Sequence, residues 1–131
     1  MKTNAELLTL VQFLNANVGE GKTKGQKKLI KIGERIQKQL DDFNEKKEEL
    51  RLDNASVDKD GNLLLNEKNE YNFNKEGVKK LNSQLKDLLL SEISFEPIPV
   101  INPEGLEQYG FLNGWVSGVE FIKTGIKEEE L

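Results

Sequence analysis

Residues 57–73 read VDKDGNLLLNEKNEYNF and carry the strongest turn signals of the chain. Asp60-Gly61 lies between apolar residues, and a two-residue type I′ hairpin turn requires the positive φ that Asp and Gly tolerate. A second polar cluster, 66–69, separates the two runs that follow. The sequence therefore predicts a small antiparallel β-meander at about residues 55–73, with strands near 55–57, 62–65 and 70–73.

A long amphipathic helix is expected before this meander, from about Thr23 to Leu52. Its apolar residues recur at close to heptad spacing, as on one face of a helix; they are Leu29, Ile32, Ile36, Leu40, Phe43 and Leu50. At 1.5 Å per residue the helix would measure about 45 Å, longer than the diameter of a small domain. We expect part of it to project or to pack on a partner. An intramolecular helix hairpin is favoured over a coiled-coil homodimer, because the apolar stripe is short and contains Lys47.

The segments on either side complete the predicted order of elements. Thr3 and Glu6 have the spacing of a capping box, so a short helix is expected from there to about residues 17–21. On the other side, Asn74 is expected to cap a helix that ends near Ser91. Residues 93–101, ISFEPIPVI, contain two prolines and read as an edge strand or an extended arm. Asn102-Pro103-Glu104 has the features of a helix start, and this last helix is expected to reach Lys123, before a frayed acidic tail at 127–131.

These expectations define the fold class. The sequence predicts one α+β domain over residues 1–131, in which a long amphipathic helix hairpin carries the meander and is followed by a helix, an extended arm and a C-terminal helix. A chain of 131 residues has the size of one ordinary domain.

The composition restricts the chemistry that the chain can perform. It contains no cysteine and no histidine, which excludes disulfides, thiolate nucleophiles, imidazole bases and the usual zinc ligands. Carboxylates, Lys, Ser, Thr and Tyr remain, and no grouping of Asp and Glu stands out. We therefore expect a protein that is not an enzyme and uses no cofactor. No apolar run approaches the roughly 18 residues of a membrane span, so no membrane contact is expected and the protein is expected to be soluble.

Basic residues gather at the start of the long helix. Residues 22–38 hold seven basic side chains against one acid, Glu34, a net charge of +6. Cations at a helix N-terminus oppose the helix dipole, and glycine-flanked amides together with lysines suit a phosphate or carboxylate. The other interpretation is a solvated lysine face that pairs with acids of this chain or of a partner. The candidate anion-binding residues are Lys22, Thr23, Lys24, Lys27, Lys28, Lys31 and Arg35.

A partial match to a calcium-binding loop lies inside the predicted meander. Asp58, Asp60 and Glu67 fall on ligand positions of the twelve-residue template. The first position is Ser56 instead of Asp, and turn and strand signals follow where the template requires a helix. A hairpin explains the same residues, so no metal site is predicted.

Glycines recur every fourth residue in the last predicted helix, where YGFLNGWVSGVEF would place them along one edge. Each glycine costs a helix up to about 1 kcal/mol relative to alanine, so the stripe suggests a close approach of backbones, within the fold or to a second subunit. Short turns in place of the helix are the alternative. The aromatic residues around the stripe are core residues or, if exposed, an interface. The candidate interface residues are Tyr109, Gly110, Phe111, Gly114, Trp115, Gly118 and Phe121.

The order of these features resembles that of small uncharacterised proteins encoded by tailed bacteriophages. The resemblance covers about residues 5–122 and rests on the basic start GKTKGQKKLIKIGERIQKQL, the acidic continuation DDFNEKKEEL, the VDKDGN turn and the closing ISFEPIP arm. It implies a phage origin and an accessory or virion-associated role in the host cytoplasm. It transfers no functional residue.

The expected function is therefore that of a non-catalytic phage protein that binds a protein partner and self-associates. It would bind through the long helix or the last aromatic helix. The alternative is a binder of an anionic ligand, either a nucleotide signal of the host defence or a nucleic acid, that uses the basic helix start at 22–38.

Overall fold

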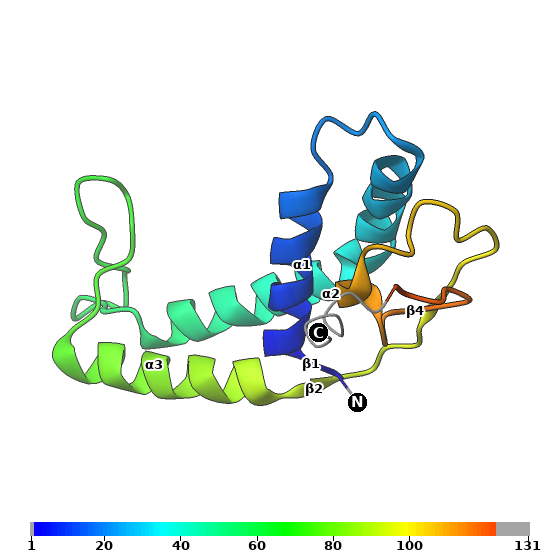
Figure 1. The fold of residues 1–131 in the computed structure, drawn as a ribbon. Coiled ribbons are helices and arrows are strands. Elements are labelled where there is room, and N and C mark those ends of the chain that lie inside the picture. The colour runs from blue at the N-terminus through cyan, green and yellow to red at the C-terminus, as the bar shows by residue number, and fades with distance from the viewer. Residues whose placement is uncertain (1, 123–131) are drawn as a thin grey trace, which may run out of the picture.

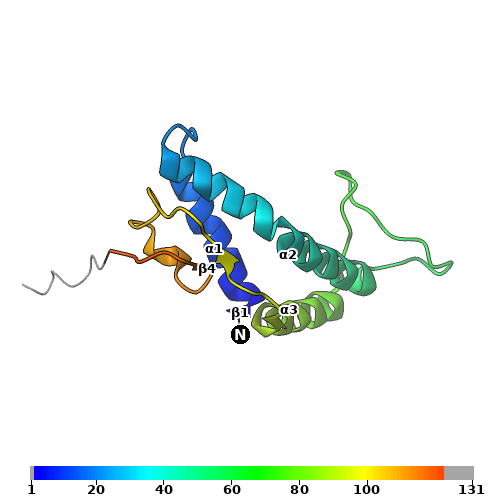
Figure 2. The ribbon, with the colours of Figure 1, turned by 90° about the vertical axis from the view of Figure 1, so that its right-hand side faces the viewer.

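The protein has a mixed α+β fold that is mostly helical, in a computed structural model that describes residues 2–122. Three helices form its frame: α1 (Asn4–Asn17), α2 (Lys24–Asn54) and α3 (Lys75–Leu90). Helix α2 contacts both of the others. In Figures 1 and 2, α1 lies beside the N-terminal half of α2, and α3 runs along its C-terminal half. We call α1, the N-terminal half of α2 and the segment after α3 the body, and the C-terminal half of α2 with α3 the arm. The two parts therefore share one long helix.

Each of the three helices begins close to the residue that the sequence predicts, and each start is capped by a side chain. Thr3 and Glu6 form the reciprocal hydrogen bonds of a capping box at the start of α1, and Thr23 forms the same arrangement with Gln26 at the start of α2. At the start of α3, the side chain of Asn74 accepts a hydrogen bond from the amide of Gly77. These bonds satisfy amides that the first helical turn leaves unpaired.

Two short pairs of strands close the body. Strand β1 (Lys2–Thr3) pairs antiparallel with β2 (Glu92–Ile93), so the chain start lies beside the end of α3. Strand β3 (Ile98–Pro99) pairs parallel with β4 (Val116–Ser117), with Ile98 opposite Val116. The predicted arm at 93–101 thus supplies one strand to each pair.

The hydrophobic core lies in the body. Its fully or nearly buried members come from α1, from the N-terminal half of α2 and from the C-terminal segment; they are Leu7, Leu10, Leu14, Leu29, Ile32, Ile36, Ile98, Leu106, Leu112, Trp115 and Val116. In the arm, Phe43 and Leu81 are buried apart from this cluster. The body therefore has a continuous core and the arm does not.

The predicted meander is a pair of tight turns joined by isolated bridges. Val57 pairs antiparallel with Leu63 and Leu65 with Tyr71, without continuous strands. The type I′ turn predicted at Asp60-Gly61 is wrong. Among these two residues only Gly61 has a positive φ, of 86°, and the amide of Gly61 donates to the carbonyl of Asp58. The connection is thus a three-residue loop with Gly61 as its left-handed residue.

The C-terminal helix expected at 102–123 does not form in its described part. The segment contains turns, the short 3₁₀ helix η1 (Gly110–Leu112) and β4. Gly105, Gly114 and Gly118 have φ values of 92°, 90° and 89°, which no α-helix contains. The alternative of short turns is therefore the correct one. The predicted end at Lys123 and the acidic tail at 127–131 lie outside the described residues.

Candidate interaction surfaces

The start of α2 uses its own side chains where an anion was expected. The hydroxyl of Thr23 accepts a hydrogen bond from the amide of Gln26 at 3.0 Å. The side-chain oxygen of Gln26 accepts from the amides of Lys22 and Thr23, at 3.0 and 3.2 Å. Three amides at this helix start, those of Lys22, Thr23 and Gln26, are therefore engaged within the chain.

The glycines at this helix start serve packing. A Cβ on Gly25 would collide with the carbonyl oxygen of Gly105, so the two backbones touch only because neither residue has a side chain. Gly21 has a φ of 69° and lies against the side chain of Ile30. These glycines therefore form the turn before α2 and its contact with the C-terminal segment.

Three of the six basic candidates are held by groups of the chain itself. Lys22 pairs with Glu20 at 2.7 Å and Lys24 with Glu104 at 3.3 Å, while the ammonium group of Lys28 donates to the carbonyl of Glu104. Within residues 2–122, the remaining basic candidates form no ion pair; they are Lys27, Lys31 and Arg35. The basic candidates therefore divide into three that are paired within the chain and three exposed cations, and anion binding stays a prediction.

The candidate interface around the glycine stripe belongs mostly to the core. Trp115 is only 4% exposed, and its ring packs edge-on against Phe95 at 5.1 Å. The ring of Phe111 stacks on that of Phe13 at 5.3 Å and is half-buried. Tyr109 and Phe121 also pack against the core.

The glycines of that stripe are not aligned as predicted. Gly110, Gly114 and Gly118 fall in a 3₁₀ turn and two left-handed turns, because the helix that would align them is absent. Only Gly118 shows the expected close approach: a Cβ there would meet the carbonyl oxygen of Val100 at 2.6 Å. This approach lies within the fold.

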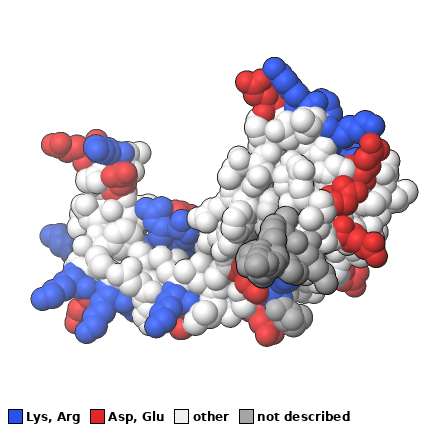
Figure 3. Space-filling view, in the orientation of Figure 1, with Lys and Arg blue, Asp and Glu red and all other residues white. Residues whose placement is uncertain are grey.

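The distal end of the arm carries exposed apolar side chains. The meander projects from the turn between α2 and α3, far from the body (Figure 1). Figure 3 shows a hollow between the meander and the body. Four side chains of the meander are 37–50% exposed and are named here the tip cluster; they are Val57, Leu63, Leu64 and Leu65. Exposed apolar side chains that lie close together mark a protein contact more often than exposed apolar side chains scattered singly over a surface.

The tip cluster is held in place by polar contacts to α2. The hydroxyl of Tyr71 donates to the carboxylate of Glu48 at 2.6 Å, which raises the pKa of Tyr71. The guanidinium of Arg51 lies 5.4 Å from the centre of the Tyr71 ring. The meander is therefore anchored to the arm through Tyr71.

The carboxylate of Asp58 belongs to a turn, as the hairpin interpretation of the calcium-like loop requires. Its Oδ1 atom accepts hydrogen bonds from the amides of Asp60 and Asn62, at 2.8 and 2.9 Å. Eight residues later, Oδ1 of Asn66 accepts from the amides of Lys68 and Glu70 in the same way. The two turns of the meander are thus copies of one arrangement.

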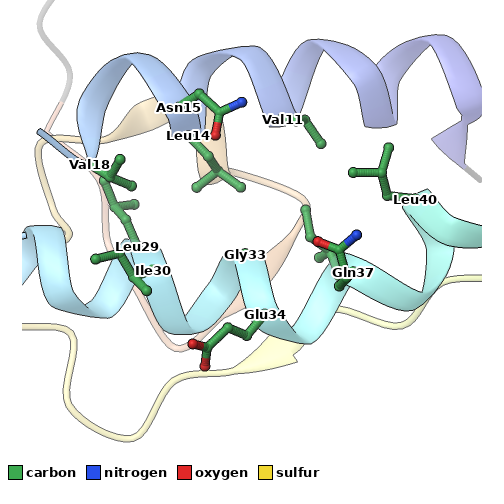
Figure 4. A pocket seen from close by; sticks show the side chains of 11 residues that line it. Val11, Leu14, Asn15, Val18, Leu29, Ile30, Gly33, Glu34, Gln37 and Leu40 are labelled. Atoms are coloured by element: carbon green, nitrogen blue, oxygen red, sulfur yellow. The ribbon is translucent and has the colours of Figure 1, made fainter.

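An apolar groove lies between α1 and α2, with a volume of about 570 Å³. Val11 and Leu14 point from α1 toward α2, whereas Glu34 points away from the groove (Figure 4). A Cβ on Gly33 would meet no atom within 4 Å. Nothing in the arrangement distinguishes one occupant of this groove from another.

Sequence reasoning found the basic part of α2 and the acidic stretch that follows it, but missed that both lie on the same face of the helix. Asp42, Glu45, Glu49 and Asp53 continue the spacing of three and four residues set by the basic side chains, and all four are exposed. The signal was present in the sequence. The shared face becomes apparent when each charged residue is placed around the helix axis. A net charge summed over a segment does not contain this information.

Comparisons with known proteins give no match: no family model, no curated protein and no solved structure is similar to this chain. Within the described residues, none of the helices is both long enough and apolar enough to cross a membrane.

Proposed function

We propose that the chain is a non-catalytic interaction protein that binds a protein partner through the distal end of its arm. The tip cluster carries this proposal, because it exposes four apolar side chains at the end of a projecting element. The resemblance to small proteins of tailed bacteriophages supports a phage origin and action in the host cytoplasm. The absence of cysteine and histidine from the sequence supports a role without catalysis.

The architecture of the arm favours binding over a purely structural role for the tip. A two-stranded hairpin is marginally stable in water without a hydrophobic face to pack against. Here the four residues of the tip cluster remain exposed, while Tyr71 and Phe73 are half-buried and contacts of Tyr71 with Glu48 and Arg51 hold the meander on α2. Burial of the tip cluster against a partner would supply the missing apolar contact, at about 25 cal/mol per Å² of apolar surface.

Affinity capture from infected cells tests this proposal. The double variant Leu63→Ser/Leu65→Ser removes apolar surface from the tip and leaves the turn-forming Asp58 and Asn66 in place. A protein that the wild type captures should be lost from this variant by tenfold or more in quantitative mass spectrometry. The matched control is Ile101→Ser, because Ile101 is fully exposed on the body. Equal capture by both variants would refute the assignment to the tip.

A second candidate function is the binding of nucleic acid along α2. The observation that favours it is the row of exposed cations Lys27, Lys31 and Arg35, which form no ion pair within the described part of the chain. Binding to a labelled oligonucleotide should then weaken steeply with salt, because cations that neutralise phosphates release counterions. A titration that stays flat at low salt would remove this candidate.

A further inference from the structure

One face of α2 carries two blocks of opposite charge. We name as the charged ridge four basic residues followed by four acidic ones: Lys27, Lys31, Arg35, Lys38, Asp42, Glu45, Glu49 and Asp53. At about 100° per residue, all eight fall within an arc of about 80° around the helix axis. All eight side chains are exposed, and they belong to one uninterrupted helix.

Like charges recur within each block of the ridge. Lys27, Lys31 and Arg35 follow one another at intervals of four residues, and so do Glu45, Glu49 and Asp53. Like charges at that spacing repel. No ridge residue takes part in an ion pair within residues 2–122. The single favourable spacing inside the ridge is Lys38 to Asp42. Beside the ridge, Glu34 lies four residues before Lys38 and Lys46 lies four residues after Asp42.

We propose that the charged ridge pairs with the same ridge of a second copy of the chain, with the two α2 helices antiparallel. In the register centred on residue 40, Lys38 faces Asp42 of the other copy and Arg35 faces Glu45. In the same register Lys31 faces Glu49 and Lys27 faces Asp53. Two-fold symmetry repeats each of these four contacts, as in an isologous dimer. Every like-charged neighbour within one chain then gains an opposite charge from the other.

The order of charges along the ridge favours a second copy of the chain as the partner and an antiparallel orientation of the two α2 helices. A parallel pair in register would place each block against an identical one, and like charges across an interface are a strong barrier to association. A nucleic acid that followed the basic block would meet the acidic block from Asp42 onward. The order of charges in the ridge is complementary to itself only when the second copy runs in reverse.

The inference is separate from the proposed function. The ridge lies on α2 and contains no residue of the tip cluster, so a tip variant should still dimerise. An interface composed of exposed ion pairs is screened by salt. The protein is therefore expected to be a dimer at low ionic strength that dissociates as salt is added.

Charge reversal tests the register. In sedimentation equilibrium at 50 mM salt, the wild type should have about twice the mass of the 14.9 kDa chain, and at 500 mM salt it should approach one chain. Arg35→Glu and Glu45→Arg should each weaken the dimer by tenfold or more. The double variant Arg35→Glu/Glu45→Arg should restore it, because the two positions face each other. All variants should keep the helical circular dichroism of the wild type, since both side chains are exposed.

Cross-linking gives an independent measure of the same register. The chain has no cysteine of its own, so the double variant Lys27→Cys/Asp53→Cys offers one defined pair between copies. A short bismaleimide should link it into a covalent dimer. The control Lys27→Cys/Glu45→Cys is out of register by eight residues, about 12 Å, and should remain monomeric.

Three results would overturn the inference. They are a monomer at 50 mM salt and tens of micromolar protein, a dimer that both single charge reversals leave unchanged, and equal cross-linking of the two cysteine pairs. If the wild type is monomeric and Arg35→Glu abolishes salt-dependent oligonucleotide binding, the basic block is a nucleic-acid surface instead.

Discussion

At the scale of single residues, the glycines divide by what surrounds them. A Cβ on Gly33 would meet no atom within 4 Å, and this residue lies inside α2. Gly105 has a φ of 92°, and a Cβ there would lie 2.9 Å from the amide nitrogen of Gly25. Position 33 therefore has room for a side chain, whereas position 105 has none.

Alanine at these two positions should therefore shift stability in opposite directions. Gly33→Ala is expected to stabilise the fold by up to about 1 kcal/mol, because alanine restricts the unfolded chain and suits a helix interior. Gly105→Ala should destabilise it by about 1–3 kcal/mol, through backbone strain and the collision with Gly25. Urea unfolding followed by the fluorescence of the single tryptophan, Trp115, measures both. Equal effects of the two variants would contradict this distinction.

Among the secondary-structure elements, those whose start is set by contacts between residues close in sequence are predicted correctly. The helices start where expected because their caps, such as Thr23 with Gln26, bond to residues three positions away. The helix predicted from residue 102 is absent from its described part, 102–122, although Asn102-Pro103-Glu104 has every local feature of a helix start. Contacts distant in sequence prevail there: β4 pairs with β3, and Gly105 packs on Gly25. Aromatic residues such as Trp115 then become core residues.

The candidate sites also divide into features set by local sequence and features set by contacts distant in sequence. The basic block of α2 is visible as a cluster in the sequence, and its positions on one face follow from the helix alone. Whether those cations are free depends on Glu104, eighty residues from its partner Lys24. The exposure of the tip cluster depends on how the meander sits on α2, which no local pattern specifies.

The meander supplies a prediction about pH. Amides of Asn62 and Asp60 donate to the carboxylate of Asp58, which lowers its pKa from the ordinary value of 3.8. Because the native pKa lies below the unfolded one, the ionised carboxylate stabilises the turn above the unfolded pKa. That contribution is lost as the pH falls through the native pKa. The amide protons of Asp60 and Asn62 should therefore shift in NMR spectra during acid titration.

The second turn of the meander is a built-in control for this titration. Asn66 occupies the place of Asp58 there and does not ionise, so the amide proton of Lys68 should shift less than that of Asn62. The variant Asp58→Asn keeps the acceptor oxygen and should remove the shift at Asp60 and Asn62. If that shift persists in the variant, another carboxylate is responsible.

At the scale of the whole molecule, the apolar core and the surface proposals occupy different parts. Eleven buried residues form one cluster in the body, whereas Phe43 and Leu81 are buried outside it, in the arm. Apolar burial is the main favourable term in folding, so the arm should be the less stable part. Both proposed contacts, at the tip cluster and along the charged ridge, involve this arm.

This distribution predicts that the arm opens before the body unfolds. Under conditions of native-state hydrogen exchange, amides of 44–54 and 75–85 should exchange faster than those of 7–14 and 29–36. Circular dichroism at 222 nm reports all three helices, whereas the fluorescence of Trp115 reports the body alone, so the first signal should change at lower urea. Lower salt should narrow the gap between the two transitions, because a dimer paired along the charged ridge would protect the arm. A single coincident transition at every salt concentration would mean that the arm is held as firmly as the core.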